Sequence, residues 1–406
     1  MSDARLEKGL DEPATEAQKP HHHLQVSRTA WLTVAGASVA LFVSFGWVNC
    51  IGLFQAEYEA NQLKDYSSSD VSWITSMEFF FMLFTSPVAG KLFDSYGPRL
   101  PIAIGSVLHI FGLMMASLSH KYYQFMLSQS VPQTWFRQKR GIVGGLTVAG
   151  SSLGGVIFPL MVQHLLPQVG FGWTMRICAF LILGLLVIAN LTISSYFRHA
   201  PRPFSVMHYL GPLRALNFGI LCTASFFMYW GLFIPFDYIA VEAIHYGMSS
   251  HMAWSLVPIL NGASFFGRTM PNYIADKVGR FNVMLVMTSL SAILVLALWL
   301  PARGNGALIT FAALFGITSG AIIGLGPVLI VSISPMSELG YRMGTVLAFA
   351  AVGTLTSPPI RGAIAADSGG SYTYTCVFSA VSFILGTIGL AALRVRLSGW
   401  GLTTKI

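Results

Sequence analysis

Charged residues are scarce in this chain. Aspartate, glutamate, lysine and arginine together make up 10% of its 406 residues, whereas a soluble domain carries about 25%. Apolar residues make up 54%, and the two figures together indicate a membrane protein. The net charge of +8 resides mostly in short segments between apolar runs, so it reports orientation in the bilayer and does not indicate a nucleic-acid partner.

Paired cysteines and clustered metal ligands are missing as well. The cysteines each fall in an apolar run and show no paired spacing, which argues against a disulfide framework; they are Cys50, Cys178, Cys222 and Cys376. Three histidines at 21–23 lie in a polar segment, and we expect no metal site there because a real site needs ligands that converge. We therefore predict neither a metal nor a cofactor.

Long polar stretches between the apolar runs are also missing. A spanning helix needs about 20 mostly apolar residues. Eleven segments meet this requirement: 30–54, 72–93, 100–118, 142–163, 172–196, 214–236, 253–274, 282–300, 307–331, 341–362 and 374–393. The short connections leave no room for a soluble catalytic domain, and the spans show no clustered acids or histidines and no nucleophile beside a base. We predict that the protein is not an enzyme.

A charged turn occurs twice, at matching places in the chain. The first copy, GKLFDSYGPR, follows the second span and contains Asp94 and Arg99. The second copy, NYIADKVGR, contains Asp276 and Arg280 and follows the span that holds Arg268. Two copies of such a turn indicate a chain built from two similar halves.

The spacing between landmarks differs between the halves. Asp94 and Asp276 lie 182 residues apart, whereas Arg140 and Arg342, each before a glycine-rich span, lie 202 apart, so the first half is 20 residues shorter. About 20 residues make one membrane crossing. The segment 122–131 begins a fourth helix, which stops at the following proline and leads into a basic run that favours the cytoplasmic side. We predict that the chain lacks most of its fourth span.

These motifs resemble those of the major facilitator superfamily, over about residues 28–395. Within it, five segments resemble the fungal monocarboxylate-transporter-like branch: VSWITSMEFFFMLF, TWFRQKRG, AGSSLGGVIFP, GFGWTMRICAF and FFGRTMPNYIADKVGRFN. The resemblance implies an all-α membrane fold with two six-helix halves. The predicted parts are a disordered tail (1–27), a first half (28–197), a central loop (198–213), a second half (214–395) and a second tail (396–406). Both tails and the loop are expected in the cytoplasm, and the plasma membrane is the default location.

Arg268 is the main candidate for contact with a solute. An arginine inside a membrane helix is costly and marks a function by default, and its guanidinium can bind a carboxylate bidentately. Its position resembles that of the arginine that pairs with the substrate carboxylate in animal lactate carriers. Those carriers have an acid one turn earlier, where this chain has Ser264, and a lysine on the first helix, where it has Asn49. The two differences favour a larger or less charged substrate. The alternatives for Arg268 are a permanent protein acid partner or a place in the cytoplasmic gate.

Other charged residues suggest coupling and gating. Glu78 lies inside the second span, where a carboxylate can exchange protons; the alternative is a side chain that reaches the outer surface. Four residues of the charged turns are expected at a cytoplasmic gate, the alternative being solvated loop charges: Asp94, Arg99, Asp276 and Arg280. Arg176 and Arg361, near the outer ends of their spans, are expected to reach the membrane surface.

The resemblance implies a multi-pass secondary transporter that works by alternating access. Its solute would be a monocarboxylate, another organic acid, or a secondary metabolite for export, and proton coupling remains open. Its partners would be the lipid bilayer, the solute and, if coupled, protons. The alternative is a non-transporting membrane protein, either a sensor or the inactive product of a deleted helix, because the fourth helix normally lines the central cavity.

Overall fold

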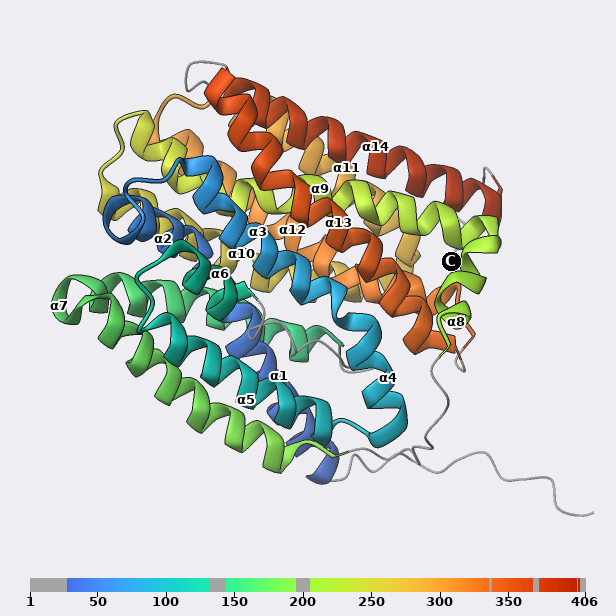
Figure 1. The fold of residues 1–406 in the computed structure, drawn as a ribbon. Helices are drawn as coiled ribbons and strands as arrows, with labels where there is room; N and C mark the ends of the chain where they lie inside the picture. Colours follow the sequence, from blue (N-terminus) through green and yellow to red (C-terminus); the bar gives the residue numbers. More distant parts are fainter. Residues whose placement is uncertain are drawn as a thin grey trace, which may run out of the picture.

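The computed structural model describes residues 28–130, 144–194, 205–335, 338–367, 372–399 and 401 (Figure 1). The segment 1–27 with its histidines, the residues 131–143 with Pro132 and the basic run, and parts of the predicted central loop and second tail lie outside these ranges.

Helices make up nearly all of the described chain. Those of the first half are α1 (Arg28–Val48), α2 (Ile51–Glu57), α3 (Ser68–Phe84), α4 (Ser86–Tyr96), α5 (Arg99–Ala116), α6 (Tyr122–Ser130) and α7 (Gly144–Thr192). The remaining helices are α8 (Met207–Leu210), α9 (Leu216–His245), α10 (Ser250–Val278), α11 (Arg280–Leu294), α12 (Asn305–Ser332), α13 (Leu339–Asp367) and α14 (Thr373–Ser398). Single turns of π-helix over Tyr58–Gln62 and Val295–Trp299 extend α2 and α11.

The helices reproduce the predicted spans. In the described residues, nine helical segments are long and apolar enough to cross a membrane. One of them, Gly150–Thr192, covers two predicted spans, and it bends at Gly170, whose positive φ of 73° suits a glycine. The predicted span 253–274 lies in α10, which is not among the nine. Together these segments account for all eleven predicted spans.

Within the described residues, the fourth span is represented by helix α6 alone. Helix α6 has 9 residues, about 14 Å of helix, whereas the hydrocarbon core is about 30 Å thick. The short helix is nevertheless well packed. The Tyr122 hydroxyl donates to the Asp70 carbonyl at 3.0 Å, and the Tyr58 hydroxyl donates to Gln129 Oε1 at 2.5 Å. The ring centroid of Phe125 lies 4.5 Å from that of Tyr58.

Each half has its own closely packed helix pair. In the first half, α1 runs along α7, and in the second, α10 runs along α12. Glycines permit both approaches, because a Cβ at Gly154 would collide with the Phe42 carbonyl and one at Gly267 with the Ile317 carbonyl.

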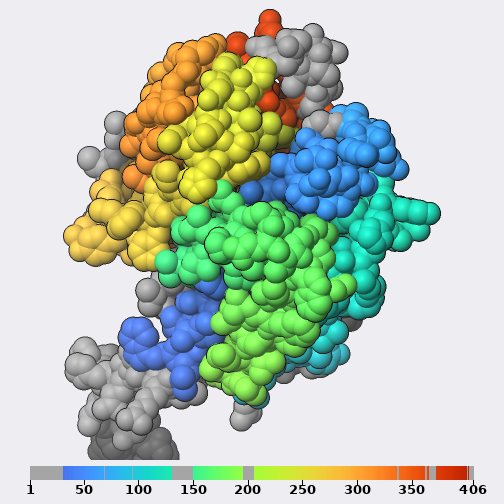
Figure 2. Space-filling model, turned by 90° about the vertical axis from the view of Figure 1, so that its left-hand side faces the viewer, coloured from blue at the N-terminus to red at the C-terminus, as the bar shows by residue number. Residues whose placement is uncertain are grey.

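The two halves meet along several helices. Helices α3 and α4 pack on α13, and α7 packs on α10. Figure 2 shows the green surface of α7 directly against the yellow surface of the second half. The space between the halves therefore has walls from both, which is where a solute cavity is expected in a two-half carrier.

Candidate substrate-binding cavity

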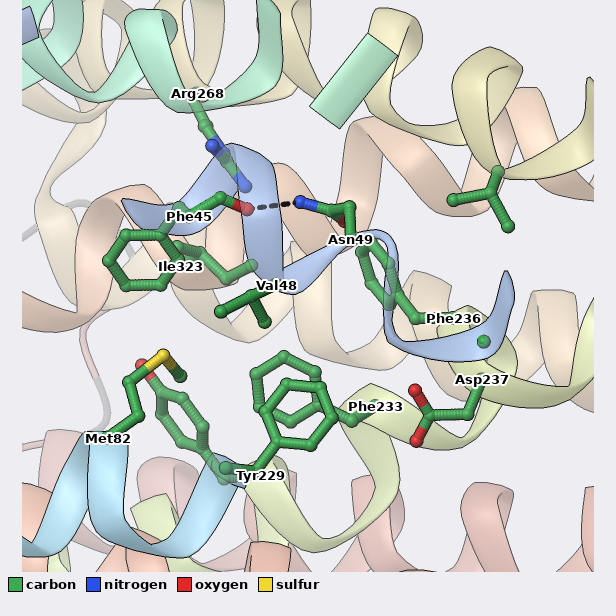
Figure 3. Close-up of a pocket in the computed structure, with 13 residues that line it drawn as sticks. Phe45, Val48, Asn49, Met82, Tyr229, Phe233, Phe236, Asp237, Arg268 and Ile323 are labelled. Atoms are coloured by element: carbon green, nitrogen blue, oxygen red, sulfur yellow. Dashed lines mark hydrogen bonds between the residues drawn. The ribbon is translucent and has the colours of Figure 1, made fainter. Parts of the chain in front are cut away.

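A cavity is lined by residues of both halves (Figure 3). Most of its lining is apolar or aromatic, and its polar side-chain groups belong to Asn49, Tyr229, Asp237 and Arg268. The full set is Phe45, Val48, Asn49, Gly52, Phe79, Met82, Tyr229, Phe233, Phe236, Asp237, Val257, Arg268 and Ile323. An apolar lining with a few polar groups is typical of small-molecule sites, in which the polar groups set the orientation of the ligand.

Arg268 reaches this cavity from α10. Its side chain is only 3% exposed, and its Nη1 donates a hydrogen bond to the Ser151 hydroxyl on α7. The neighbouring Gly267 lets α10 lie against α12. The side chain of Arg268 therefore points away from that contact and toward the first half. Arg268 therefore lines the cavity and also joins the two halves of the molecule.

Asn49 belongs to the cavity lining and lies at the break between α1 and α2. Its Nδ2 donates to the Phe45 carbonyl at 2.5 Å, a bond that satisfies one of the carbonyls at the end of α1. A Cβ at Gly155 would lie 2.9 Å from that amide nitrogen and 2.6 Å from Asn261 Oδ1, so the missing side chain on α7 makes room for both amides.

Two other predicted site residues lie outside the lining. Ser264 is fully buried on α10 but faces α12, where a Cβ at Gly320 would lie 2.8 Å from its hydroxyl. Glu78 is 1% exposed on α3, and within the described residues its carboxylate oxygens have no hydrogen-bond partner of good geometry. The amide nitrogen of Gln129, on α6, is likewise without a partner there. The prediction that Glu78 is buried in the second span agrees with this placement.

Sequence reasoning missed Asp237, the carboxylate that lines the cavity. It lies on α9 in the apolar run FIPFDYIAVEAIH and is 6% exposed. The signal that identifies Glu78, an acid within an apolar span, applies equally to this position.

The expectation that Arg361 reaches the membrane surface is wrong. This arginine, on α13, is buried among aromatic rings. Its guanidinium carbon lies 3.1 Å from the ring centroid of Tyr238 and 5.1 Å from that of Tyr372. Ring faces stabilise a buried cation, so the rings of Tyr238 and Tyr372 allow this arginine to stay inside the bundle. Arg176 instead stacks on the exposed Trp173 ring, 5.1 Å from its centroid.

The charged turns lie at the ends of their helices. Asp276 is 71% exposed and lies 3.7 Å from Arg280, which also donates to the Ser332 hydroxyl at 3.1 Å. Arg99 donates to the Ile193 carbonyl at 3.2 Å, and the backbone of Asp94 lies in α4. The contacts described for Arg99, Asp276 and Arg280 remain within their own halves.

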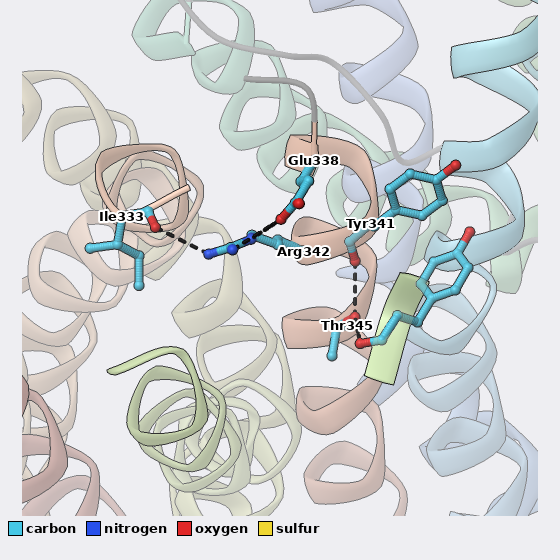
Figure 4. A network of polar contacts seen from close by, with 6 residues as sticks. Ile333, Glu338, Tyr341, Arg342 and Thr345 are labelled. Atoms are coloured by element: carbon cyan, nitrogen blue, oxygen red, sulfur yellow. Dashed lines mark hydrogen bonds and ion pairs between the residues drawn. The ribbon is translucent and has the colours of Figure 1, made fainter. Parts of the chain in front are cut away.

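A second polar network lies at the start of α13 (Figure 4). Arg342 lies 3.0 Å from the Glu338 carboxylate and donates to the Ile333 carbonyl at 3.2 Å. Nearby, the Thr345 hydroxyl donates to the Tyr209 carbonyl at 3.0 Å, which attaches the short helix α8 to α13.

This end of α13 also contacts the first half. The Tyr209 hydroxyl donates to the Pro87 carbonyl on α4 at 2.9 Å. A Cβ at Gly344 would lie 2.9 Å from the Pro87 Cα, so only a glycine permits this approach. This junction joins α8 and α13 to α4, the helix that carries the first charged turn, and sequence reasoning did not identify it.

Comparisons with known proteins place the chain in a family. The profile of the Major Facilitator Superfamily matches residues 36–302, and the chain belongs to this superfamily of membrane transporters.

Similar fungal proteins are MFS transporters. The chain is 81% identical to the MFS-type transporter opdF of Penicillium oxalicum over 428 positions, which cover 100% of both chains. It is 36% identical to the aspyridones efflux protein apdF of Emericella nidulans, over 92% of this chain and 79% of that one. The solved structure of the nucleoside transporter NupG shares the fold, with a TM-score of 0.68 at 12% identity, over 89% of this chain and 99% of that one.

The first of these alignments bears on the fourth span. It runs over 428 positions, whereas this chain has 406 residues, so at least 22 positions carry no residue of this chain. This number is close to the deficit of 20 residues between the repeated landmarks.

Proposed function

We propose that the chain is built to export a small organic solute, of the secondary-metabolite class, by alternating access of its two halves to the cavity. The supporting observation is the cavity itself, which has walls from both halves and a buried arginine at their junction. Relatives named as efflux proteins for aspyridones and fujikurins, 36% and 40% identical, favour export. A monocarboxylate or another organic acid remains a second substrate class, in line with the resemblance to the monocarboxylate-transporter-like branch.

In this proposal Arg268 binds the acidic group of the solute. A carboxylate or another acidic oxygen would compete with the Ser151 hydroxyl for the guanidinium, because both are acceptors for the same donors. Solute binding would then weaken a contact between α7 and α10 and favour their separation, which links occupancy to movement. Asn49 would bind a polar group of the solute. Ser264 would support Arg268 from the side of α10 that packs on α12.

Proton coupling is a further part of the proposal. Glu78 is the candidate carrier, since it is buried in a span beside Gln129 and lacks a well-formed hydrogen bond among the described residues. The turns with Asp94, Arg99, Asp276 and Arg280 would regulate the cytoplasmic opening. Both termini would face the cytoplasm, in the plasma membrane.

The alternative is that this form of the chain does not transport. Helix α6 has less than half of the length that a span needs, and it contributes no residue to the cavity lining. A chain that folds without this span would then act as a sensor or have no activity.

Transport into proteoliposomes distinguishes the two readings. Three proteins are compared under an imposed pH gradient with a panel of organic acids: the chain as given, the chain with about 20 apolar residues inserted after Ser130, and that restored chain with Arg268→Ala. Arg268→Lys keeps the charge but loses the planar fork, and the exposed Arg303→Ala serves as the control. We expect uptake by the restored chain and its control, and loss in both Arg268 variants. Normal transport by Arg268→Ala would refute the assignment of Arg268 to the binding site. If none of the proteins transports any of the acids, the result supports the non-transporting alternative.

A further inference from the structure

The carboxylate of Asp237 faces the cavity without a protein partner. It is 6% exposed and belongs to the lining (Figure 3). Within the part of the chain that the structure describes, it accepts no hydrogen bond, and no basic side chain lies within ion-pair distance. A buried carboxylate in this state is costly unless something outside the chain completes it.

The positive charge that acts on Asp237 is engaged elsewhere. Arg361 is the cation whose field reaches this carboxylate, but its guanidinium lies over the Tyr238 ring, 3.1 Å from the centroid. The neighbouring Tyr372 ring lies on the same guanidinium. Arg361 therefore offsets part of the charge at a distance and leaves the two oxygens of Asp237 able to accept hydrogen bonds from the cavity.

The cavity consequently has a basic side chain and an acidic side chain in its lining. Arg268 reaches it from α10 and Asp237 from α9, and Figure 3 shows them in different parts of the lining. Aromatic side chains lie near Asp237 on the same helix, with the ring centroids of Phe233 and Phe236 6.1 Å apart. An elongated solute with an apolar body and polar groups at both ends is complementary to this arrangement.

We propose that Asp237 determines specificity by accepting a hydrogen bond from a hydroxyl or N–H group at the far end of a solute whose acidic group lies at Arg268. The substrate class is then an organic acid with an aromatic or aliphatic body and a second, donating group remote from the acid. The inference rests on the proposed function in that it places the acid at Arg268, but it concerns binding and does not require transport. A site built to bond a substrate donor discriminates strongly against an analogue that lacks it, because the buried acceptor is then unpaired.

The test measures binding by the purified full chain in detergent at constant pH. Three probes of similar shape differ only at one end: 3-(4-hydroxyphenyl)propanoate, its 4-methoxy ether and 3-phenylpropanoate. We expect the hydroxylated acid to bind about tenfold more tightly than the other two, as a hydrogen bond to a buried acceptor that is otherwise unpaired should produce. In Asp237→Leu, which has similar size and no acceptor, the three dissociation constants should fall within about twofold of one another. The matched control is Glu242→Gln, since Glu242 is a buried acid on the same helix that does not line the cavity, and the preference should persist there.

Other outcomes overturn the inference. They are equal binding of the three acids by the unaltered chain, failure of the hydroxylated acid to bind, a preference that survives Asp237→Leu, and a preference that is lost equally in Glu242→Gln. Failure of the proposed function gives a different result. In that case the chain binds the hydroxylated acid selectively in detergent but transports none of it in proteoliposomes, so the binding site is present and transport is absent.

Discussion

Within the described residues, the two halves of this molecule differ in the length of their fourth helix. In the second half, α12 has 28 residues and contributes Ile323 to the cavity. Helix α6 of the first half has 9 residues and contributes nothing. The first half nevertheless supplies lining residues from α1, α2 and α3. The comparison teaches that both halves line the candidate site although α6 contributes no residue to it.

The largest expected effect comes from restoring the missing span. Without it, α5 and α7 lose neighbours that a full-length helix would provide, and local opening is easier where packing is sparse. We expect amides in α5 and the first half of α7 to exchange hydrogen at least about tenfold faster than those in α10 and α12. Inserting about 20 apolar residues after Ser130 should bring the two sets within about threefold. Hydrogen–deuterium exchange with mass spectrometry measures both, and equal rates in the unaltered chain would contradict the comparison.

The glycine contacts within each half give the next largest effect. Valine at Gly267 would drive its side chain into the Ile317 backbone, and overpacking against a backbone costs about 3 kcal/mol or more. Valine at Gly154 meets the Phe42 backbone in the same way, but a first half with fewer neighbours can relax, so we expect a smaller cost there. Thermal unfolding in detergent compares them, with Gly184→Val as the control because no atom lies within 4 Å of a Cβ at that position. A cost at Gly154 equal to that at Gly267 would show that the first half is as rigid as the second.

The junction between the halves gives a moderate effect. Tyr209→Phe removes the hydrogen bond to the Pro87 carbonyl, which contributes about 1 kcal/mol, or about fivefold in the fraction of open molecules. The measurement is the labelling rate of a cysteine at the buried Leu347, in a chain without its native cysteines. Tyr341→Phe is the control, because the Tyr341 hydroxyl donates no hydrogen bond within the described residues. Unchanged labelling in Tyr209→Phe would mean that α8 does not hold the two halves together.

The charged turn of the second half gives the smallest effect. Asp276 is 71% exposed and lies 3.7 Å from Arg280, and exposed pairs of this kind contribute about 0.5 kcal/mol or less. We expect Asp276→Asn to leave the unfolding midpoint in detergent nearly unchanged, while a role in gating would appear as a change in transport rate. A large loss of stability in this variant would show that the turn holds the fold together.

Much of the fold followed from the sequence, because a spanning helix has to be about 20 residues long and apolar. The repeated turns and their unequal spacing also allowed the missing fourth span to be predicted. The prediction for Arg268 agrees with its place in the cavity, because a charge in an apolar helix is informative by itself. Its role in binding stays a prediction, as do those of Asn49, Ser264, Glu78 and the gate residues.

The features that were missed depend on neighbours that are distant in the sequence. Arg361 looked like a surface residue because the rings of Tyr238 and Tyr372 that cover it belong to α9 and to the residue before α14. The contact of Tyr209 with Pro87 spans 122 positions of the chain and involves a backbone carbonyl, for which no sequence pattern exists. Ser264 shares a helix with Arg268, but close packing on α12 sets the direction that each side chain takes.

The bend of α7 at Gly170 has a consequence for how the protein is made. The two spans on either side of it are joined without an intervening polar loop, and the turn is formed by a residue with a positive φ. A ribosome delivers such a pair as one continuous apolar stretch of about 40 residues, too long for a single crossing. The two spans are therefore expected to enter the bilayer together as a hairpin, so that a substitution that stiffens Gly170 impairs insertion of the chain before it affects any folded property.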